Sequence, residues 1–281
     1  MESRITYKDI IDHKKISDEE LTSDILKLKN FDASENKRCF YGNNFLYHYQ
    51  IDNLCKVSIK GKPSLYNIMN DDILYKKLYD KMLKLNRTGT IPNRLFEAER
   101  FNNAVVFFKA TTAKYLYKKY KATSVLDPTA GWGGRMLGAH ALNIKYTGID
   151  TNTNLKEAYT QMISKLNDNN LKMIFDDCLN VDFSQIEYDF VLTSPPYINL
   201  EIYENMTPFE NKEIFYKKFL IPLLEKCLKH IKKGGKVAFN ISPVMYKDLL
   251  SFGFRKCDIE DDLLQQKRLG KDKQDKIYIW Q

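Results

Sequence analysis

The sequence lacks the features typical of membrane-spanning, secreted and metal-binding proteins. No stretch approaches the roughly 18 consecutive apolar residues that cross a bilayer. The start, MESRITYKDIIDHKK, has neither the apolar core of a signal peptide nor the Arg/Ser bias of a transit peptide. The five cysteines form no Cys-x-x-Cys pair, and the four histidines show no metal-ligand spacing. We therefore expect a soluble, cytoplasmic or other intracellular protein without membrane contact, disulfide framework or metal.

The chain does contain the material for a folded core and an excess of basic residues. Hydrophobic residues make up 43% of its 281 residues, and the formal net charge is +8. A sequence pI near 9.0 is compatible with a polyanionic partner such as a nucleic acid. Lysine runs such as residues 114–121 also suit a solvated helix face, so the charge permits a nucleic-acid partner without proving it.

Strand and helix patterns alternate over residues 96–281. The predicted strands are 123–128, 145–150, 172–177, 188–194 and 236–242, followed by a closing antiparallel pair at 254–260 and 276–280. This alternation predicts a Rossmann-like α/β domain, a mostly parallel seven-stranded sheet with helices on both faces. Pro222 is expected to interrupt a long amphipathic helix before the fifth strand. Residues 1–95 read as a separate, smaller and mainly helical region.

A glycine-containing loop follows the first predicted strand, in the segment VLDPTAGWGG. Asp127 and Pro128 lead into Gly131 and Gly133, and a helical pattern follows. Glycines at this point let the backbone approach a ligand, and a helix N-terminus offers free amides. A dinucleotide loop would need a third glycine where Met136 stands, and the acid in the loop would repel a pyrophosphate.

Acidic residues also end the second and third predicted strands. Asp150 is placed to hold both hydroxyls of a ribose, and Asp176 or Asp177 can accept a hydrogen bond from an adenine amino group. A cationic or zwitterionic nucleoside suits the carboxylate of Asp127 better than a pyrophosphate does. The pattern therefore favours S-adenosylmethionine, with its ammonium and sulfonium, as the cofactor.

Two prolines and a tyrosine end the fourth predicted strand, in the segment VLTSPPY. Proline cannot donate to a sheet ladder, so the strand stops at Pro195. With Ser194, Pro196 and Tyr197, it forms a rigid tetrad at the edge where ligands bind in such sheets. A stiff turn would explain the prolines alone; a site for a flat substrate also explains the tyrosine.

The tetrad and the loop together resemble the amino-group methyltransferases that modify exocyclic nitrogens of DNA bases. The signature of that family, of the N4-cytosine and N6-adenine type, is an Asp/Asn/Ser-Pro-Pro-aromatic tetrad after strand four. An acid followed by Gly-x-Gly after strand one is its cofactor loop. The resemblance covers about residues 100–281 and implies a class I methyltransferase fold that binds S-adenosylmethionine. It also suggests Phe101 as an aromatic contact to the methionine end of the cofactor.

The resemblance assigns chemistry to the tetrad. The lone pair of a base amine is delocalised into the ring, and acceptors aimed at its hydrogens make the nitrogen a better nucleophile. Ser194 Oγ and the Pro195 carbonyl would be those acceptors, held by the fixed φ angles of Pro195 and Pro196. Tyr197 would stack on the base once it has left the duplex. Serine in the first position favours N4 of cytosine over N6 of adenine.

One departure from the family concerns target recognition. No sizeable recognition domain follows the tetrad, so residues 1–95 are the candidate for this role. The substrate is predicted to be DNA, with an RNA base amine as the alternative within catalysis. A non-catalytic nucleic-acid-binding subunit with a remnant fold is the alternative from another class. The oligomeric state, the recognition sequence and any companion restriction enzyme stay open.

Overall fold

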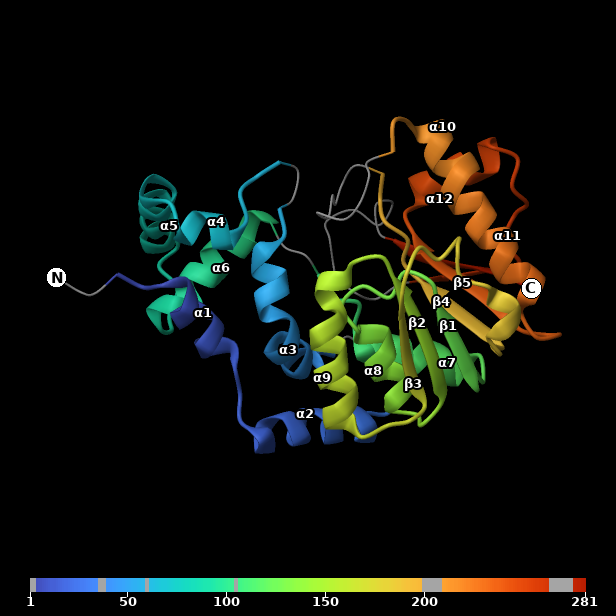
Figure 1. Cartoon of the computed structure of the whole chain (residues 1–281), viewed down its shortest axis with the longest axis horizontal. Coiled ribbons are helices and arrows are strands. Elements are labelled where there is room, and N and C mark those ends of the chain that lie inside the picture. The colour runs from blue at the N-terminus through green and yellow to red at the C-terminus, as the bar shows by residue number, and fades with distance from the viewer. Residues whose placement is uncertain (1–3, 35–38, 59–60, 104–105, 199–208, 263–274) are drawn as a thin grey trace.

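The computed structural model describes residues 4–34, 39–58, 61–103, 106–198, 209–262 and 275–281. Its centre is a seven-stranded sheet in the order β3-β2-β1-β4-β5-β7-β6 (Figure 1). The strands are β1 Ser124–Asp127, β2 Lys145–Asp150, β3 Leu171–Phe175, β4 Phe190–Thr193, β5 Lys236–Ile241, β6 Ile259–Asp262 and β7 Lys276–Trp280.

The strand directions set where a ligand can bind. Strands β3, β2, β1, β4 and β5 pair in parallel, and β7 lies antiparallel between β5 and β6. The strand order reverses between β1 and β4, which lead outward to β2 and β5 on opposite sides. Ligands of such sheets bind beyond the carboxyl ends of the strands at this switch point. The order confirms the predicted Rossmann-like class I methyltransferase fold with a closing antiparallel pair. The first strand of that pair lies at Ile259–Asp262 and not at the predicted residues 254–260.

Helices cover both faces of the sheet. From the helix before β1 onward, the bounds are α7 Ala110–Lys119, α8 Gly134–His140, η1 Thr153–Leu155, α9 Lys156–Leu166, η2 Phe183–Gln185, α10 Lys212–Phe215, η3 Tyr216–Leu220, α11 Ile221–His230 and α12 Pro243–Ser251. Side chains of α7, α8 and α9 share one core cluster with one face of the sheet, and those of α11 and α12 share a second cluster with the other face.

The strands show why both faces are apolar. Ile277 and Ile279 of β7 belong to the first cluster, whereas Tyr278 and Trp280 belong to the second. This alternation follows from the two-residue period of a strand. A sheet covered on both sides therefore needs near-continuous apolar strands, as the sequence has.

The interruption predicted at Pro222 is present. Helix α10 is followed by the π-helical turn η3, and α11 then begins at Ile221 with Pro222 in its first turn. Proline has no N–H to donate and its ring crowds the preceding turn, so a widened turn just before it is the expected accommodation.

The N-terminal residues form helices, as predicted. They are α1 Tyr7–Lys14, α2 Asp18–Asn30, α3 Asn43–Lys56, α4 Leu65–Met69, α5 Asp72–Leu85 and α6 Ile91–Asn103. Figure 1 shows α4, α5 and α6 at the end of the molecule opposite α10, α11 and α12. Helix α3 contacts both α9 and the other N-terminal helices α1, α2 and α4. The predicted boundary at residues 95 and 96 falls within α6.

Two helices of this region pack directly on the sheet-covering helices. A Cβ added at Gly42 would lie 3.2 Å from a Leu28 methyl and 3.3 Å from both Ala110 of α7 and Leu137 of α8. The buried ammonium of Lys114, on α7, donates to the carbonyls of Leu28, Lys29 and Phe31 at the end of α2. Apolar residues of both regions therefore belong to one core cluster.

Candidate active site

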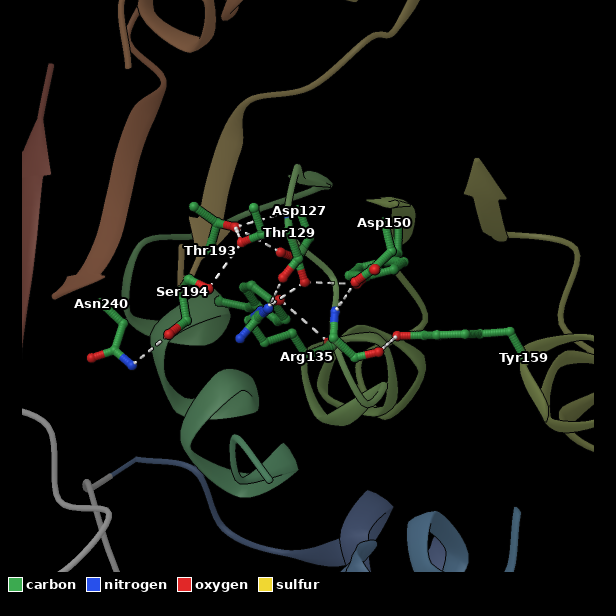
Figure 2. A network of polar contacts seen from close by, with 11 residues as sticks. Asp127, Thr129, Arg135, Asp150, Tyr159, Thr193, Ser194 and Asn240 are labelled. Carbon is green, nitrogen blue, oxygen red and sulfur yellow. Dashed lines mark hydrogen bonds and ion pairs between the residues drawn. The ribbon is translucent and has the colours of Figure 1, made fainter. Parts of the chain in front are cut away.

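The glycine-containing loop after β1 and the tetrad after β4 meet at the switch point of the sheet. Asp127 ends β1, and Thr193 ends β4 directly before Ser194. Figure 2 shows Asp127, Thr129 and Thr193 turned toward one another, with Ser194 and Asn240 to one side and Asp150 and Tyr159 to the other. The fold thus brings together residues that the sequence places in four separate segments.

Asp127 is the buried centre of this network. Its side chain is 0% exposed. One carboxylate oxygen accepts from Arg135 Nε at 2.6 Å and from Tyr146 Oη at 2.7 Å, and the other accepts from Thr193 Oγ1 at 2.9 Å. The cation that meets the Asp127 carboxylate is therefore Arg135 from this chain. This differs from the sequence-based argument, in which Asp127 awaits the cationic part of a ligand.

Arg135 binds both the Asp127 carboxylate and the backbone of the loop. Burial disfavours its charge, but the attraction of Asp127 outweighs burial and raises the pKa of Arg135. Its Nη2 donates to the Thr129 carbonyl at 2.5 Å. Since a buried ion pair is stable only when its other hydrogen-bonding positions are also satisfied, Asp127 and Arg135 hold the loop in one conformation.

Thr129 and Thr193 join the loop to the tetrad. The backbone N–H of Thr129 donates to Thr193 Oγ1 at 3.1 Å, and the two hydroxyl oxygens lie 2.7 Å apart. Thr129 Oγ1 also donates to the Ser194 carbonyl at 3.0 Å. These bonds run from the chain after β1 to the first residue of the tetrad.

Asp150 lies on the other side of the loop. Its carboxylate accepts from the Gly131 N–H at 2.7 Å and from the Asn152 N–H at 2.9 Å. Burial raises the pKa of Asp150 to about 6, although these two backbone bonds oppose the shift. An ionised carboxylate has about four lone-pair positions, so acceptor capacity remains for a ligand's hydroxyls.

The backbone of the loop explains its glycines. Gly131 has φ +60° and Gly133 has φ +94°, in the left-handed region that favours glycine. The Gly131 carbonyl accepts from Tyr159 Oη at 2.9 Å, while its N–H is held by Asp150. Both polar groups of this peptide segment are therefore fixed before any ligand arrives.

The tetrad is held on its other side by β5. Asn240 is buried, and its Nδ2 donates to Ser194 Oγ at 3.2 Å. Its Oδ1 is inaccessible to water and has no hydrogen-bond partner among the described residues. Pro195 is buried, and Tyr197 lies half-buried against the second core cluster.

The remaining predicted residues occupy the same edge or lie outside what is described. Pro128 is buried within the loop, and Asp176 and Asp177 are exposed directly after β3. Asp176 accepts from the Asp177 N–H, and Asp177 accepts from the Leu179 N–H, so each uses one oxygen in the local turn. Phe101 lies on α6, but its side chain is outside the described part of the structure.

Sequence reasoning missed the residues that connect these groups. Thr129 and Thr193 directly follow or precede the predicted site residues Pro128 and Ser194, and this adjacency was the available signal. Arg135 and Tyr146 gave no such signal, because their partner Asp127 becomes their neighbour only when β1, β2 and α8 pack together.

Comparison with known proteins gives partial and distant similarities. No protein-family model matches the chain. The type II methyltransferase M.MjaVI of Methanocaldococcus jannaschii is 34% identical over 76 residues, which are 26% of this chain and 37% of that protein. The match thus spans little more than a third of the relative's length.

Solved structures with a similar fold include TrmN and an enzyme named as an rRNA methylase. TrmN from Thermus thermophilus has a TM-score of 0.47 at 16% identity, covering 60% of this chain and 48% of its own. An rRNA methylase from Streptococcus thermophilus has a TM-score of 0.42 at 15% identity, covering 63% of this chain and 97% of its own. The fold assignment rests on the strand order.

Within the described ranges, no helix is both long and apolar enough to cross a membrane. The same residues contain no group of three or more His, Cys, Asp or Glu side chains arranged to hold a metal ion.

Proposed function

We propose that this chain transfers a methyl group from S-adenosylmethionine to the exocyclic amino group of a DNA base, with N4 of cytosine favoured over N6 of adenine. One observation carries the proposal. The tetrad at the end of β4 is hydrogen-bonded through Thr129 to the glycine-containing loop at the end of β1. A cofactor loop and a rigid set of amine acceptors thus lie side by side at the switch point.

The residues at the loop fit S-adenosylmethionine. Gly131 and Gly133 allow the backbone to approach a ligand closely, and the Asp150 carboxylate keeps acceptor positions for the ribose hydroxyls. Asp176 or Asp177 would accept from the adenine amino group, and Phe101 would contact the methionine end. We assign Asp127 and Pro128 to the shape of the loop, because Asp127 is buried and already paired with Arg135. The bound cofactor supplies an electrophilic methyl group.

The tetrad would prepare the attacking nitrogen. Ser194 Oγ and the Pro195 carbonyl accept hydrogen bonds from the two amine hydrogens, which localises the nitrogen lone pair. The Ser194 carbonyl already accepts from Thr129, so it is committed to holding the tetrad in place. The new C–N bond forms as the bond between the methyl carbon and sulfur breaks, and one amine proton then leaves to solvent. Holding nitrogen and methyl in line supplies much of the rate.

Tyr197 would bind the base itself. A base inside a duplex cannot reach a buried strand end, so it must leave the stack. An aromatic ring that stacks on an extruded base contributes about 1–3 kcal/mol to its binding. Serine at the first tetrad position is the reason to favour cytosine.

Target recognition would fall to residues 1–95. The net charge of +8 suits a polyanionic substrate, and the partial similarity to a type II methyltransferase supports methyl transfer as the reaction class.

The test is incubation of the full chain with isotopically labelled S-adenosylmethionine and separate DNA and RNA pools, followed by nucleoside mass spectrometry. Labelled N4-methylcytosine in DNA is the expected product. Labelled N6-methyladenine in DNA would retain the reaction but reverse the choice of base. A labelled base in the RNA pool alone would replace DNA by RNA as substrate, and absence of label from both pools would refute the proposal.

A further inference from the structure

The backbone pairing of β1 with β4 stops before these strands reach the loop and the tetrad. The β1–β4 ladder pairs Val125 with Phe190 and Leu126 with Val191. Beyond these pairs the two chains lead to the cofactor loop and to the tetrad. Methyl transfer needs these two segments at a fixed separation, because a misplacement of about 1 Å can cost a factor of about 100 in rate.

Hydrogen bonds of Thr129 span this gap. Its N–H donates to Thr193 Oγ1 at 3.1 Å, and its hydroxyl lies 2.7 Å from Thr193 Oγ1 and 3.0 Å from the Ser194 carbonyl oxygen. A carboxylate can only accept, so the Thr193 hydroxyl proton points to Asp127. The Thr129 hydroxyl must therefore donate, and the Ser194 carbonyl is an acceptor within its reach.

The Ser194 carbonyl belongs to the peptide that begins the tetrad. This peptide is trans, as are all peptide bonds of the described residues, and it is planar. Fixing its oxygen therefore fixes the direction in which Pro195 leaves, and the proline rings restrict the φ angles that follow. The start of the loop after β1 is also held in place, since Asp127 accepts hydrogen bonds from Arg135 and Tyr146.

We propose that Thr129 is a positioning residue, whose hydroxyl fastens the Ser194–Pro195 peptide to the cofactor loop and so sets the distance between amine and methyl group. Its role in catalysis rests on the function proposed above. Thr129 touches neither the amine nor the methyl group; it acts through Ser194 and Pro195.

The test compares Thr129→Val, which removes the hydroxyl at nearly constant volume, with Thr129→Ser, which keeps it. Both variants keep the backbone N–H. The control is Thr160→Val, which removes an exposed hydroxyl that donates to the Lys156 carbonyl on α9. The measurements are the cofactor Kd by calorimetry, kcat and KM for DNA, and crystal structures of the two Thr129 variants.

We expect Thr129→Val to lower kcat roughly 10- to 100-fold, with the cofactor Kd and the KM for DNA each within about threefold of wild type. Thr160→Val should retain wild-type kcat, and Thr129→Ser should recover most of the kcat that Thr129→Val loses. In the crystal structure of Thr129→Val the Ser194–Pro195 peptide should be displaced relative to the loop, and in Thr129→Ser it should not.

Several results would overturn the inference. They are a wild-type kcat in Thr129→Val, an equal loss in Thr129→Ser, or a loss of cofactor affinity in proportion to the loss of rate. If the wild-type chain methylates nothing, the proposed function fails, and the crystal structures decide the inference separately. An unmoved Ser194–Pro195 peptide in Thr129→Val would then refute it, and a displaced one would support it.

Discussion

Tyr197 is proposed to bind the substrate base and not the cofactor, so a change of this residue tests the two kinds of binding separately. It follows the two prolines of the tetrad and lies half-buried against the second core cluster. The loop that is proposed to bind the cofactor follows β1, and Asp150, proposed for the same site, ends β2. A change of the Tyr197 ring should therefore act on the base and leave the cofactor site intact.

We predict that Tyr197→Ala lowers methyl transfer roughly 5- to 150-fold, the loss that corresponds to about 1–3 kcal/mol of stacking on the base, while the cofactor Kd stays within about threefold. Calorimetry and a methyl-transfer assay measure the two effects. The control is Tyr197→Phe, which keeps the ring and should retain most of the activity. Normal methylation by Tyr197→Ala would show that the stacking role is wrong.

If Asp150 binds the ribose of the cofactor as proposed, cofactor binding should depend on pH. Burial raises the pKa of its carboxyl to about 6, so the carboxylate takes up a proton as the pH falls through this value. Only the ionised form can accept both ribose hydroxyls. Since the apparent Kd scales inversely with the competent fraction, it should be roughly tenfold higher one pH unit below 6 than at pH 8.

Calorimetric titration with cofactor from pH 5 to pH 8 checks this dependence, with Asp150→Asn as the control. The variant cannot ionise, so its affinity should be weak and flat with pH over that range. An unchanged pH profile in Asp150→Asn would remove Asp150 from the cofactor site.

The raised pKa of Asp150 also affects stability. Because the folded state binds this proton more tightly than the unfolded state, the contribution of Asp150 to the free energy of unfolding falls as the pH rises from about 4 to about 6 and does not change further above about pH 6.

At the scale of elements, the start of α8 packs against the chain before α7. A Cβ added at Gly134, the first residue of α8, would lie 1.8 Å from the carbonyl oxygen of Phe108. Backbone cannot swing aside as a side chain can, so this glycine sets how closely the loop that begins α8 approaches α7. A second close approach occurs at Gly138, where a Cβ would lie 2.6 Å from Ala113 Cβ.

We predict that Gly134→Ala lowers the free energy of unfolding by about 3 kcal/mol or more, because the clash with Phe108 must displace backbone. Urea denaturation measures the change. Gly253→Ala is the control: Gly253 has φ +90° but nothing within 4 Å of an added Cβ, so it should lose only about 1 kcal/mol from backbone strain. Equal losses in the two variants would contradict the packing argument.

At the scale of the whole molecule, the N-terminal helices and the sheet share a core. Asp24 on α2 accepts from the N–H groups of Gly42 and Phe45, which fixes the start of α3 against α2. Lys114 of α7 is 5% exposed and has three carbonyls at the end of α2 as acceptors. Removal of α2 and α3 would leave this ammonium without those acceptors and expose apolar side chains of α7 and α8.

We therefore predict that residues 96–281 alone do not fold cooperatively, whereas the full chain unfolds in one transition. Circular dichroism during thermal unfolding compares the two chains at equal concentration. A full chain with Lys114→Met serves as the control, because it removes the charge and keeps the apolar contacts, and it should still fold. A sharp transition of the truncated chain would show that residues 1–95 are an appendage to an independent domain.

The alternation of strands and helices, the site edge and the interruption at Pro222 could all be predicted from local patterns. Alternating apolar segments and turn residues specify strands and helices over a few residues, and parallel strands place all their carboxyl ends at one edge. The tetrad and the loop were recognisable because their chemistry depends on residues adjacent in sequence, such as Ser194 and Pro195.

The partners of Asp127 could only be known from the tertiary structure. Arg135 and Thr193 reach the same carboxylate from α8 and β4, and no local pattern encodes a contact between side chains brought together by packing. For the same reason the shared core of α2, α3, α7 and α8 does not follow from their separate amphipathic patterns. The sequence by itself determined which chemical groups stand at the edge of the sheet. The packing of the folded chain decided which of them are bound to one another and which retain capacity for a ligand.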